Sequence, residues 1–241
     1  MRKIYLFAVI MAVAATSFGQ NNPTSKKKID FSGRTGDHFM IQLSGDNWLG
    51  APDSIKSNAK PVSRGFNAYV MLDKVFKNNP SFSVAGGVGI STSGIFLTKM
   101  TADVTGTVST LKFNNLSGSN YFNKYKIATT YAEIPVELRY CEKPEAPNKS
   151  IKAAIGVKVG TLLNAHAKGK NWTDVSGKTI NAYTAKMTSK SYFNGTRLSA
   201  TARVGYGNFS LFGAYSITSV FKDNVAADMK LLQVGLTISG L

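Results

Sequence analysis

Residues 131–140 read YAEIPVELRY, a run in which apolar and polar side chains alternate. The even-numbered positions from 132 to 138 carry Ala, Ile, Val and Leu, whereas the odd-numbered positions include two glutamates and an arginine. Successive side chains of a β-strand point to opposite faces of the sheet, so this period of two residues predicts a strand with one apolar and one charged face. The predicted strand covers residues 126–140.

The same alternation recurs along the rest of the chain. Seven further segments show it: 37–45, 65–76, 81–91, 151–161, 197–206, 209–217 and 231–239. After about residue 20, no apolar run approaches the roughly 20 residues that a transmembrane helix needs. The sequence therefore predicts an all-β protein with eight strands.

The connections between these strands alternate between short and long. Three are short and contain Asn, Gly or Pro, which suit tight turns: 77–80, 142–149 and 207–208. Four are long and polar: 46–64, 94–124, 164–196 and 220–230. An even number of strands, with short turns at one end and long loops at the other, is typical of an outer-membrane barrel.

The two faces of the strands indicate which side of the barrel meets lipid. The polar face is rich in Gly, Ser and Thr, with a few large ionisable side chains among them. In a membrane barrel the apolar face contacts lipid and the polar face fills the interior. We therefore expect an ionic network inside the barrel, formed by Glu133, Glu137, Arg139, Lys152, Lys158, Arg197 and Arg203.

Aromatic residues near the strand ends fit two interfacial belts. The belt on the long-loop side would comprise Trp48, Phe96, Tyr121, Phe122, Tyr125, Tyr192 and Phe193. The belt on the short-turn side would comprise Phe76, Tyr140, Tyr206 and Phe209. The alternative is a soluble, lipocalin-like barrel, in which the apolar face would point inward and hold a small ligand.

The amino-terminal segment has the pattern of an export signal. Arg2 and Lys3 precede an apolar stretch, and Ser17-Phe18-Gly19 is a small-x-small cleavage pattern. We predict a signal peptide over residues 1–19, a flexible periplasmic lead-in over 20–36 and a barrel domain over 37–241.

Composition excludes several classes of protein. The chain has 241 residues, 29 Lys and Arg against 13 Asp and Glu, and a net charge of +16. Only 17% of residues are charged and 11% are aromatic, which argues against disorder and against a Lys/Glu-rich helical bundle. Cys141 is the single cysteine and His38 and His166 are the two histidines, so neither an intrachain disulfide nor a cysteine-based metal site is possible.

The positive charge raises the question of an anionic partner. Predicted export argues against nucleic acid. Many lysines of the long loops could instead face lipopolysaccharide phosphates, namely Lys56, Lys60, Lys99, Lys168, Lys170, Lys178, Lys186 and Lys190. Outer-membrane lipid and the barrel-assembly machinery are the other expected partners.

Three patterns could suggest chemistry, and each has a plainer interpretation. His166, Asp174 and Ser176 co-occur in a long loop, but a triad needs them within hydrogen-bond reach of one another. Glu133 and Glu137 could act as an acid–base pair, although cations on the same face favour an ionic network. The glycine run at 86–89 lacks the Lys-Ser/Thr of a phosphate loop and suits close packing in a strand. We predict no catalytic, cofactor-binding or metal site.

Residues 131–140 also resemble a recurring strand of the PorT-like outer-membrane β-barrel proteins of Bacteroidetes. The resemblance extends to the strand at 156–160 and to the closing strand at 234–239. It implies an outer-membrane β-barrel, and its motifs are structural rather than catalytic. The PorT name is linked to a protein secretion system.

Together these observations predict an eight-stranded antiparallel up-and-down barrel in the outer membrane, with short periplasmic turns and long extracellular loops. Eight strands enclose an interior just wide enough for side chains. The expected function is non-enzymatic, a structural or binding role carried by the long loops. The alternative is a narrow, porin-like channel or a secretion accessory.

Overall fold

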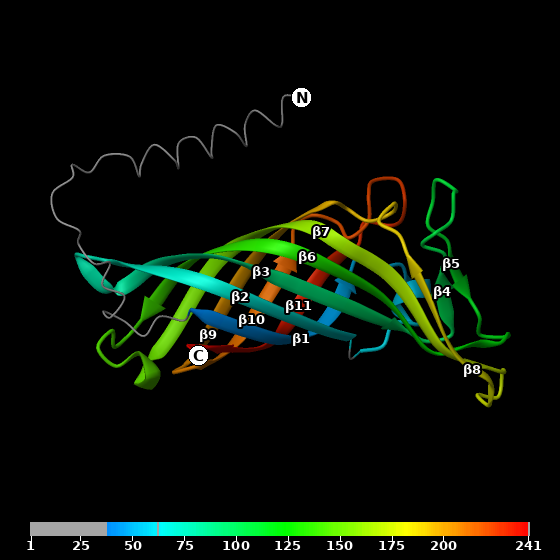
Figure 1. Cartoon of the computed structure of the whole chain (residues 1–241), viewed down its shortest axis with the longest axis horizontal. Helices are drawn as coiled ribbons and strands as arrows, with labels where there is room; N and C mark the ends of the chain where they lie inside the picture. Colours follow the sequence, from blue (N-terminus) through cyan, green and yellow to red (C-terminus); the bar gives the residue numbers. More distant parts are fainter. Residues whose placement is uncertain (1–37, 62, 241) are drawn as a thin grey trace, which may run out of the picture. The chain divides into compact units, whose positions relative to one another are not determined.

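A computed structural model of the chain describes residues 38–61 and 63–240, so the predicted signal peptide (1–19) and lead-in (20–36) lie outside the described residues. Within these residues eight long strands form a closed antiparallel ring (Figure 1). They are β1 (Phe39–Leu49), β2 (Ser63–Phe76), β3 (Asn79–Leu97), β6 (Tyr121–Cys141), β7 (Ile151–Thr173), β9 (Thr196–Tyr206), β10 (Phe209–Ser216) and β11 (Lys230–Ser239).

Each of these strands pairs with its neighbour in sequence, and β11 pairs with β1 to close the ring. The eight predicted strands and the up-and-down order are therefore confirmed. Closure leaves the ring without an edge strand, so its backbone N–H and C=O groups are paired without water.

The apolar faces of the strands point outward. Leu72, Ile155, Leu211 and Phe209 are 61–66% exposed, while the opposite faces are buried inside the ring. A continuous belt of large exposed apolar side chains fits lipid and does not fit water. The alternative of a soluble, lipocalin-like barrel is wrong, because it requires these side chains to point inward.

The short turns gather at one end of the barrel, here called the turn end, and the long connections at the other, here called the loop end (Figure 1). The β9–β10 turn depends on Gly207, whose φ of 58° is in the left-handed region. A Cβ atom at this position would lie 2.6 Å from the carbonyl oxygen of Asn148, in the neighbouring β6–β7 connection. That connection contains a short 3-10 helix, η2 (Pro147–Lys149), and Cys141 lies buried beside it as a free thiol.

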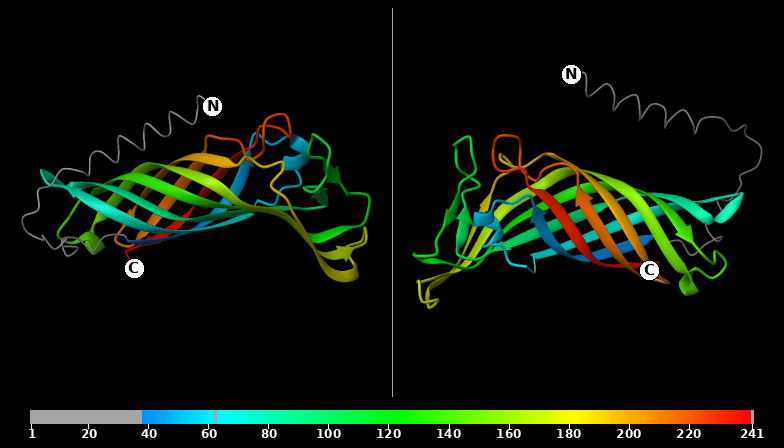
Figure 2. Two further views of the ribbon diagram at one scale, coloured as in Figure 1. Left: turned by 45° about the horizontal axis from the view of Figure 1, so that its top comes forward. Right: turned by 180° about the vertical axis from the view of Figure 1, so that it is seen from behind.

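The loop end is more ordered than the sequence predicted. Strand β7 continues to Thr173 and pairs there with β8 (Thr179–Thr188), although residues 164–196 were expected to form a loop. The apolar–polar alternation is weak in this segment, because its inward positions carry only the small residues Ala165, Ala167 and Gly169. Figure 2 shows β6 and β7 continuing past the other strands toward β8.

Smaller elements complete the loop end. They are α2 (Asp53–Lys56), β4 (Met100–Ala102) and β5 (Phe113–Asn115), the last two forming a separate two-stranded sheet. None of the helices in the described part of the chain has the length and apolar character needed to span a bilayer.

The two predicted aromatic belts have different outcomes. At the turn end, Phe76, Tyr140, Tyr206 and Phe209 are exposed on the outside of the barrel, as a belt requires. At the loop end the prediction is wrong for four aromatic residues, which are buried inside the structure: Trp48, Tyr125, Tyr192 and Phe193. They pack with the folded loops instead of facing lipid.

A charge on the apolar belt tests whether it contacts lipid. Leu236 is 57% exposed on β11, in the middle of the belt. Leu236→Arg is expected to lower the free energy of unfolding from lipid vesicles by about 2–4 kcal/mol, the cost of a cation near the bilayer midplane. Denaturant titration followed by tryptophan fluorescence measures this change.

Val108→Arg provides the control, because Val108 is similarly exposed (49%) but lies between β4 and β5, outside the belt. This variant should change the free energy by less than about 0.5 kcal/mol. Equal effects of the two variants would mean that the belt does not contact lipid.

Candidate functional site

The interior of the barrel is crossed by ion pairs centred on Glu133 of β6. Arg197 of β9 places Nη2 2.7 Å and Nε 3.0 Å from Oε1 of this carboxylate. On the other oxygen, Tyr69 of β2 donates its hydroxyl to Oε2 at 2.5 Å, and the Lys158 ammonium on β7 is 3.5 Å away. Four strands are therefore joined through one fully buried carboxylate.

The same group extends to the opposite wall of the barrel. Arg197 donates from Nη2 to the hydroxyl of Ser91 on β3 at 2.6 Å, and its guanidinium lies 4.1 Å from the ring centroid of Tyr131. Ser91 in turn donates to Asn67 at 2.7 Å, and Asn67 donates to Gln42 at 3.1 Å. Polar side chains thus span the lumen from β9 to β1.

A second group lies nearer the turn end. Glu137 accepts from Arg139 Nε at 2.9 Å and lies 3.2 Å from Arg203 Nη2. These three side chains are all at least nine-tenths buried. Lys152, the seventh residue of the predicted network, is 8% exposed on the inner face of β7. The structure thus places all seven residues in the lumen, with one group of ion pairs around Glu133 and a second around Glu137.

Sequence analysis did not single out several interior residues. Asp46 is buried and accepts hydrogen bonds from Ser44 and Gln233. Tyr69 donates its hydroxyl to the carboxylate of Glu133. The alternation does place Asn67 and Tyr69 on the polar face of β2. Their partners could not be identified, because they come from strands far apart in the sequence.

The glycine run at 86–89 makes room for this interior. A Cβ atom at Gly89 would lie 2.4 Å from the ring of Tyr69, and one at Gly87 would lie 2.5 Å from Met71 Sδ. The large side chains of β2 therefore lie over the bare backbone of β3. This close packing is the structural role that the sequence indicated for the run.

An apolar cluster closes the loop end above the ion pairs, and we call it the cap. Its buried members are Trp48, Ile55, Ile95, Leu97, Met100, Ala102, Val104, Leu111, Tyr125, Ile127, Tyr131, Leu162, Ala165, Ala167, Tyr192, Phe193, Val220, Phe221, Met229 and Leu231. Phe221 is central, with ring centroids 5.4 Å from Trp48 and 5.2 Å from Phe193. The cap was not predicted, because the loop residues that form it show no strand or helix period.

Side-chain hydrogen bonds attach the loops to the cap. Tyr125 on β6 donates its hydroxyl to the carbonyl of Ala102 at 2.7 Å and accepts from the Ala102 amide at 2.9 Å. Tyr192 donates to the carbonyls of Gly106 and Val108 at 2.7 and 2.8 Å. Burial raises the pKa of Tyr125 to about 12, so the hydroxyl remains protonated and can donate at neutral pH.

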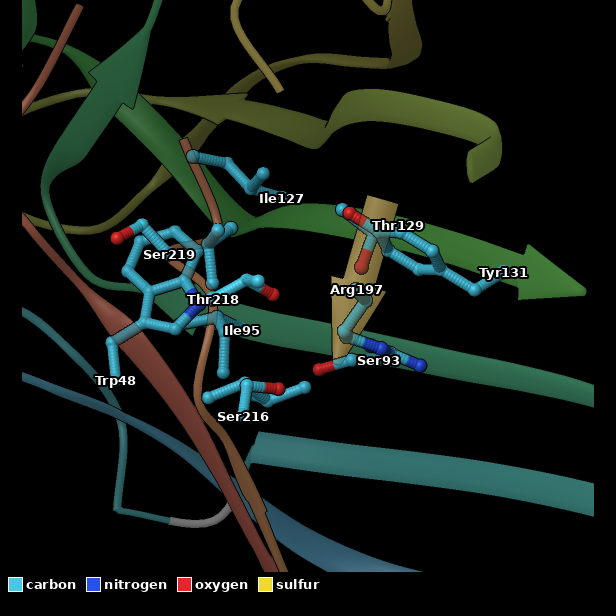
Figure 3. Close-up of a pocket in the computed structure, with 12 residues that line it drawn as sticks. Trp48, Ser93, Ile95, Ile127, Thr129, Tyr131, Arg197, Ser216, Thr218 and Ser219 are labelled. Atoms are coloured by element: carbon cyan, nitrogen blue, oxygen red, sulfur yellow. The ribbon is translucent and has the colours of Figure 1, made fainter. Parts of the chain in front are cut away.

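The described part of the interior includes two small cavities, each of about 10 Å³. Such a volume has room for about one water molecule. Figure 3 shows the first, where Trp48, Ile127 and Tyr131 of the cap meet Arg197 of the ionic network. The second lies among side chains that include Gln42, Glu137, Lys158, Arg203 and Phe212.

The candidate catalytic groups are not assembled. His166 lies on the outward face of β7, eight residues from Asp174, which is about 26 Å along a strand. Asp174 accepts from Ser176 at 2.6 Å within the β7–β8 turn, and hydrogen bonds from Ser176 and the Lys178 amide lower its pKa. Within residues 38–61 and 63–240, no three His, Cys, Asp or Glu side chains lie close enough to hold a metal ion.

Comparison with known proteins gives a family. The model of the outer membrane protein beta-barrel domain matches residues 18–222, and the chain belongs to this family. Two crystal structures of Ail, the attachment invasion locus protein of Yersinia pestis, are similar at 14% and 12% sequence identity. Each similarity covers 83% of this chain and 94% of Ail with a TM-score of 0.33, and the first structure contains the heparin analogue sucrose octasulfate. No curated protein matches the sequence significantly.

Removing the central carboxylate tests the importance of the ion pairs. Glu133→Ala leaves Arg197 and Lys158 buried without their anion, and breaking such a pair costs about 3–5 kcal/mol. The free energy of unfolding in detergent micelles should fall by this amount. Glu142→Ala, which removes an exposed carboxylate just beyond β6, should change it by less than about 0.5 kcal/mol. An unchanged Glu133→Ala protein would show that the network contributes nothing to stability.

Proposed function

We propose that this outer-membrane β-barrel is a non-enzymatic protein whose lumen is filled by its own side chains and whose role is carried by its loop end. The loop end faces the cell exterior and the turn end faces the periplasm, as in other bacterial barrels of this kind. The role is structural or binding, and the folded loops present the surface that a partner meets.

The observation that carries this proposal is the double closure of the lumen. The hydrogen bond of Glu133 with Tyr69 on β2 and its ion pair with Arg197 on β9 join opposite walls, and the cap covers the loop end above them. The two small cavities described above each have room for about one water molecule. A solute of any size would have to displace both layers.

The positions of the titratable groups support a non-enzymatic role. Glu133 and Glu137 are both buried and engaged by cations, and the cavity that Glu137 lines has room for about one water molecule. His166 is far from Asp174 and Ser176 along the β7–β8 hairpin. General acid–base or nucleophilic catalysis needs such groups within hydrogen-bond reach of one another and of a substrate.

Export and assembly follow from the same proposal. Residues 1–19 act as the signal peptide and residues 20–36 remain in the periplasm as a polar lead-in. The barrel-assembly machinery inserts the strands, and outer-membrane lipid then surrounds the apolar belt.

The alternative is a narrow channel or a PorT-like secretion accessory. It rests on the resemblance of residues 131–140 to the PorT-like barrels, and in this structure that segment carries both glutamates of the lumen. An accessory role would not need an open lumen, so conductance cannot test it. The test of this role is whether a deletion strain loses protein secretion.

Conductance distinguishes the closed barrel from a channel. The purified full-length protein in a planar lipid bilayer should show no conductance steps between pH 6 and 8, because both the ionic network and the cap block the lumen. A known porin inserted under the same conditions confirms that channels would be detected. Reproducible single-channel steps from this protein would contradict the proposal and favour the narrow channel.

A further inference from the structure

Five lysines share the outward face of the three strands that extend from the barrel at the loop end. Lys126 of β6 is paired in register with Lys168 of β7, and Lys168 with Lys186 of β8. Lys124 and Lys170 form the next pair outward on the same face. The opposite face of these strands packs on the cap through Ile127, Ala167 and Met187, which fixes the lysines outside.

This arrangement is unfavourable without an anion. Like charges placed directly opposite each other in a sheet are destabilising. In the part of the chain that the structure describes, no carboxylate lies within ion-pair distance of any of the five lysines. Burial and the neighbouring Lys168 lower the pKa of Lys126.

The row lies just beyond the lipid-facing belt. Leu163, 50% exposed, is the last large apolar side chain on the outside of β7, and Lys168 follows five residues later. With a rise of about 3.3 Å per residue and a strand tilt near 40°, Lys168 lies about 12 Å beyond Leu163 along the membrane normal. Lysine stems commonly bend toward the headgroups, which brings the ammonium groups closer still.

One lysine already bends in this direction. The Cδ and Nζ atoms of Lys126 lie 3.7 and 3.9 Å from the position that a Cβ atom would take at Gly94. Gly94 on β3 is two residue pairs nearer the membrane than Phe96, which is opposite Lys126. Arg64 on β2 is opposite Gly94, so its outward side chain adds another cation beside the row.

We propose that Lys126, Lys168 and Lys186, called here the lysine row, bind the phosphate groups of a phosphorylated glycolipid in the outer leaflet. The proposal rests on the proposed function, since it names the ligand class of the loop end. Three ammonium groups lie side by side on neighbouring strands and match a phosphate dianion, which has three acceptor oxygens. The row lies just beyond the lipid-facing belt, at the level of the membrane surface where the phosphate groups of such a lipid lie.

His166 provides an independent reporter of the bound anion. It lies two residue pairs nearer the belt than Lys168, on the same face, and burial together with Lys186, Lys126 and Lys168 lowers its pKa. A phosphate held by the row would offset the lysines and raise the pKa of His166 toward its ordinary value.

The test uses the full-length protein in detergent micelles and diphosphorylated lipid A as the probe. The variant Lys126→Gln/Lys168→Gln/Lys186→Gln should bind this lipid at least tenfold more weakly than the wild type. The control Lys178→Gln/Lys190→Gln/Lys222→Gln removes the same charge from exposed loop positions and should bind within about twofold of the wild type. Circular dichroism checks that both variants are folded.

The other arms separate the possible sources of phosphate. Dephosphorylated lipid A should bind weakly to the wild type, and millimolar inorganic phosphate or a soluble sulfated polysaccharide should not compete.

Proton NMR titration should show a higher pKa of His166 with lipid A than without it. Equal losses in both triple variants, tight binding of the dephosphorylated lipid, or full competition by inorganic phosphate or the polysaccharide would each overturn the proposal. The lipid-binding measurements are independent of the conductance measurement. Failure of the lysine-row proposal can therefore be distinguished from failure of the closed-barrel proposal.

Discussion

The need to pair every backbone N–H and C=O group in lipid determines the rest of this structure. A bilayer interior offers no water to satisfy an open sheet edge, so the strands must close into a ring. The β1–β11 pairing completes this ring over ten residue pairs, from Met40↔Ser239 to Leu49↔Lys230. Once the ring is closed, the alternation of each strand assigns one face to lipid and the other to the lumen.

Closure with eight strands then sets the contents of the lumen. The space is narrow, so a few long side chains can reach across it, as Arg197 on β9 does to Glu133 on β6 and Ser91 on β3. Small residues such as Gly87 and Gly89 accommodate the larger Met71 and Tyr69 opposite them. Burying charges is costly, and for Glu133 and Glu137 this cost is offset because each of the two carboxylates is engaged by two cations.

Much of this could be predicted from the alternation alone, because lipid and lumen impose opposite polarities on neighbouring residues. The eight strands, their order and the inward position of residues such as Glu133 and Arg203 follow from that pattern. The extension of β7 beyond Leu163 could not, since its inward residues are alanine and glycine and carry little apolar signal. The cap was also missed, because Trp48 and Phe221 meet only after the loops fold back over the barrel mouth. Aromatic residues expected at an interface proved to be the core of that cap.

The mobility of the unheated protein on a detergent gel tests the central claim most directly. A closed membrane barrel resists the detergent at room temperature, so the protein from an outer-membrane fraction should run as a compact band that shifts only after boiling. A protein recovered from the soluble periplasmic fraction, with the same mobility before and after boiling, would contradict the account. The outward apolar faces would then have no lipid to contact.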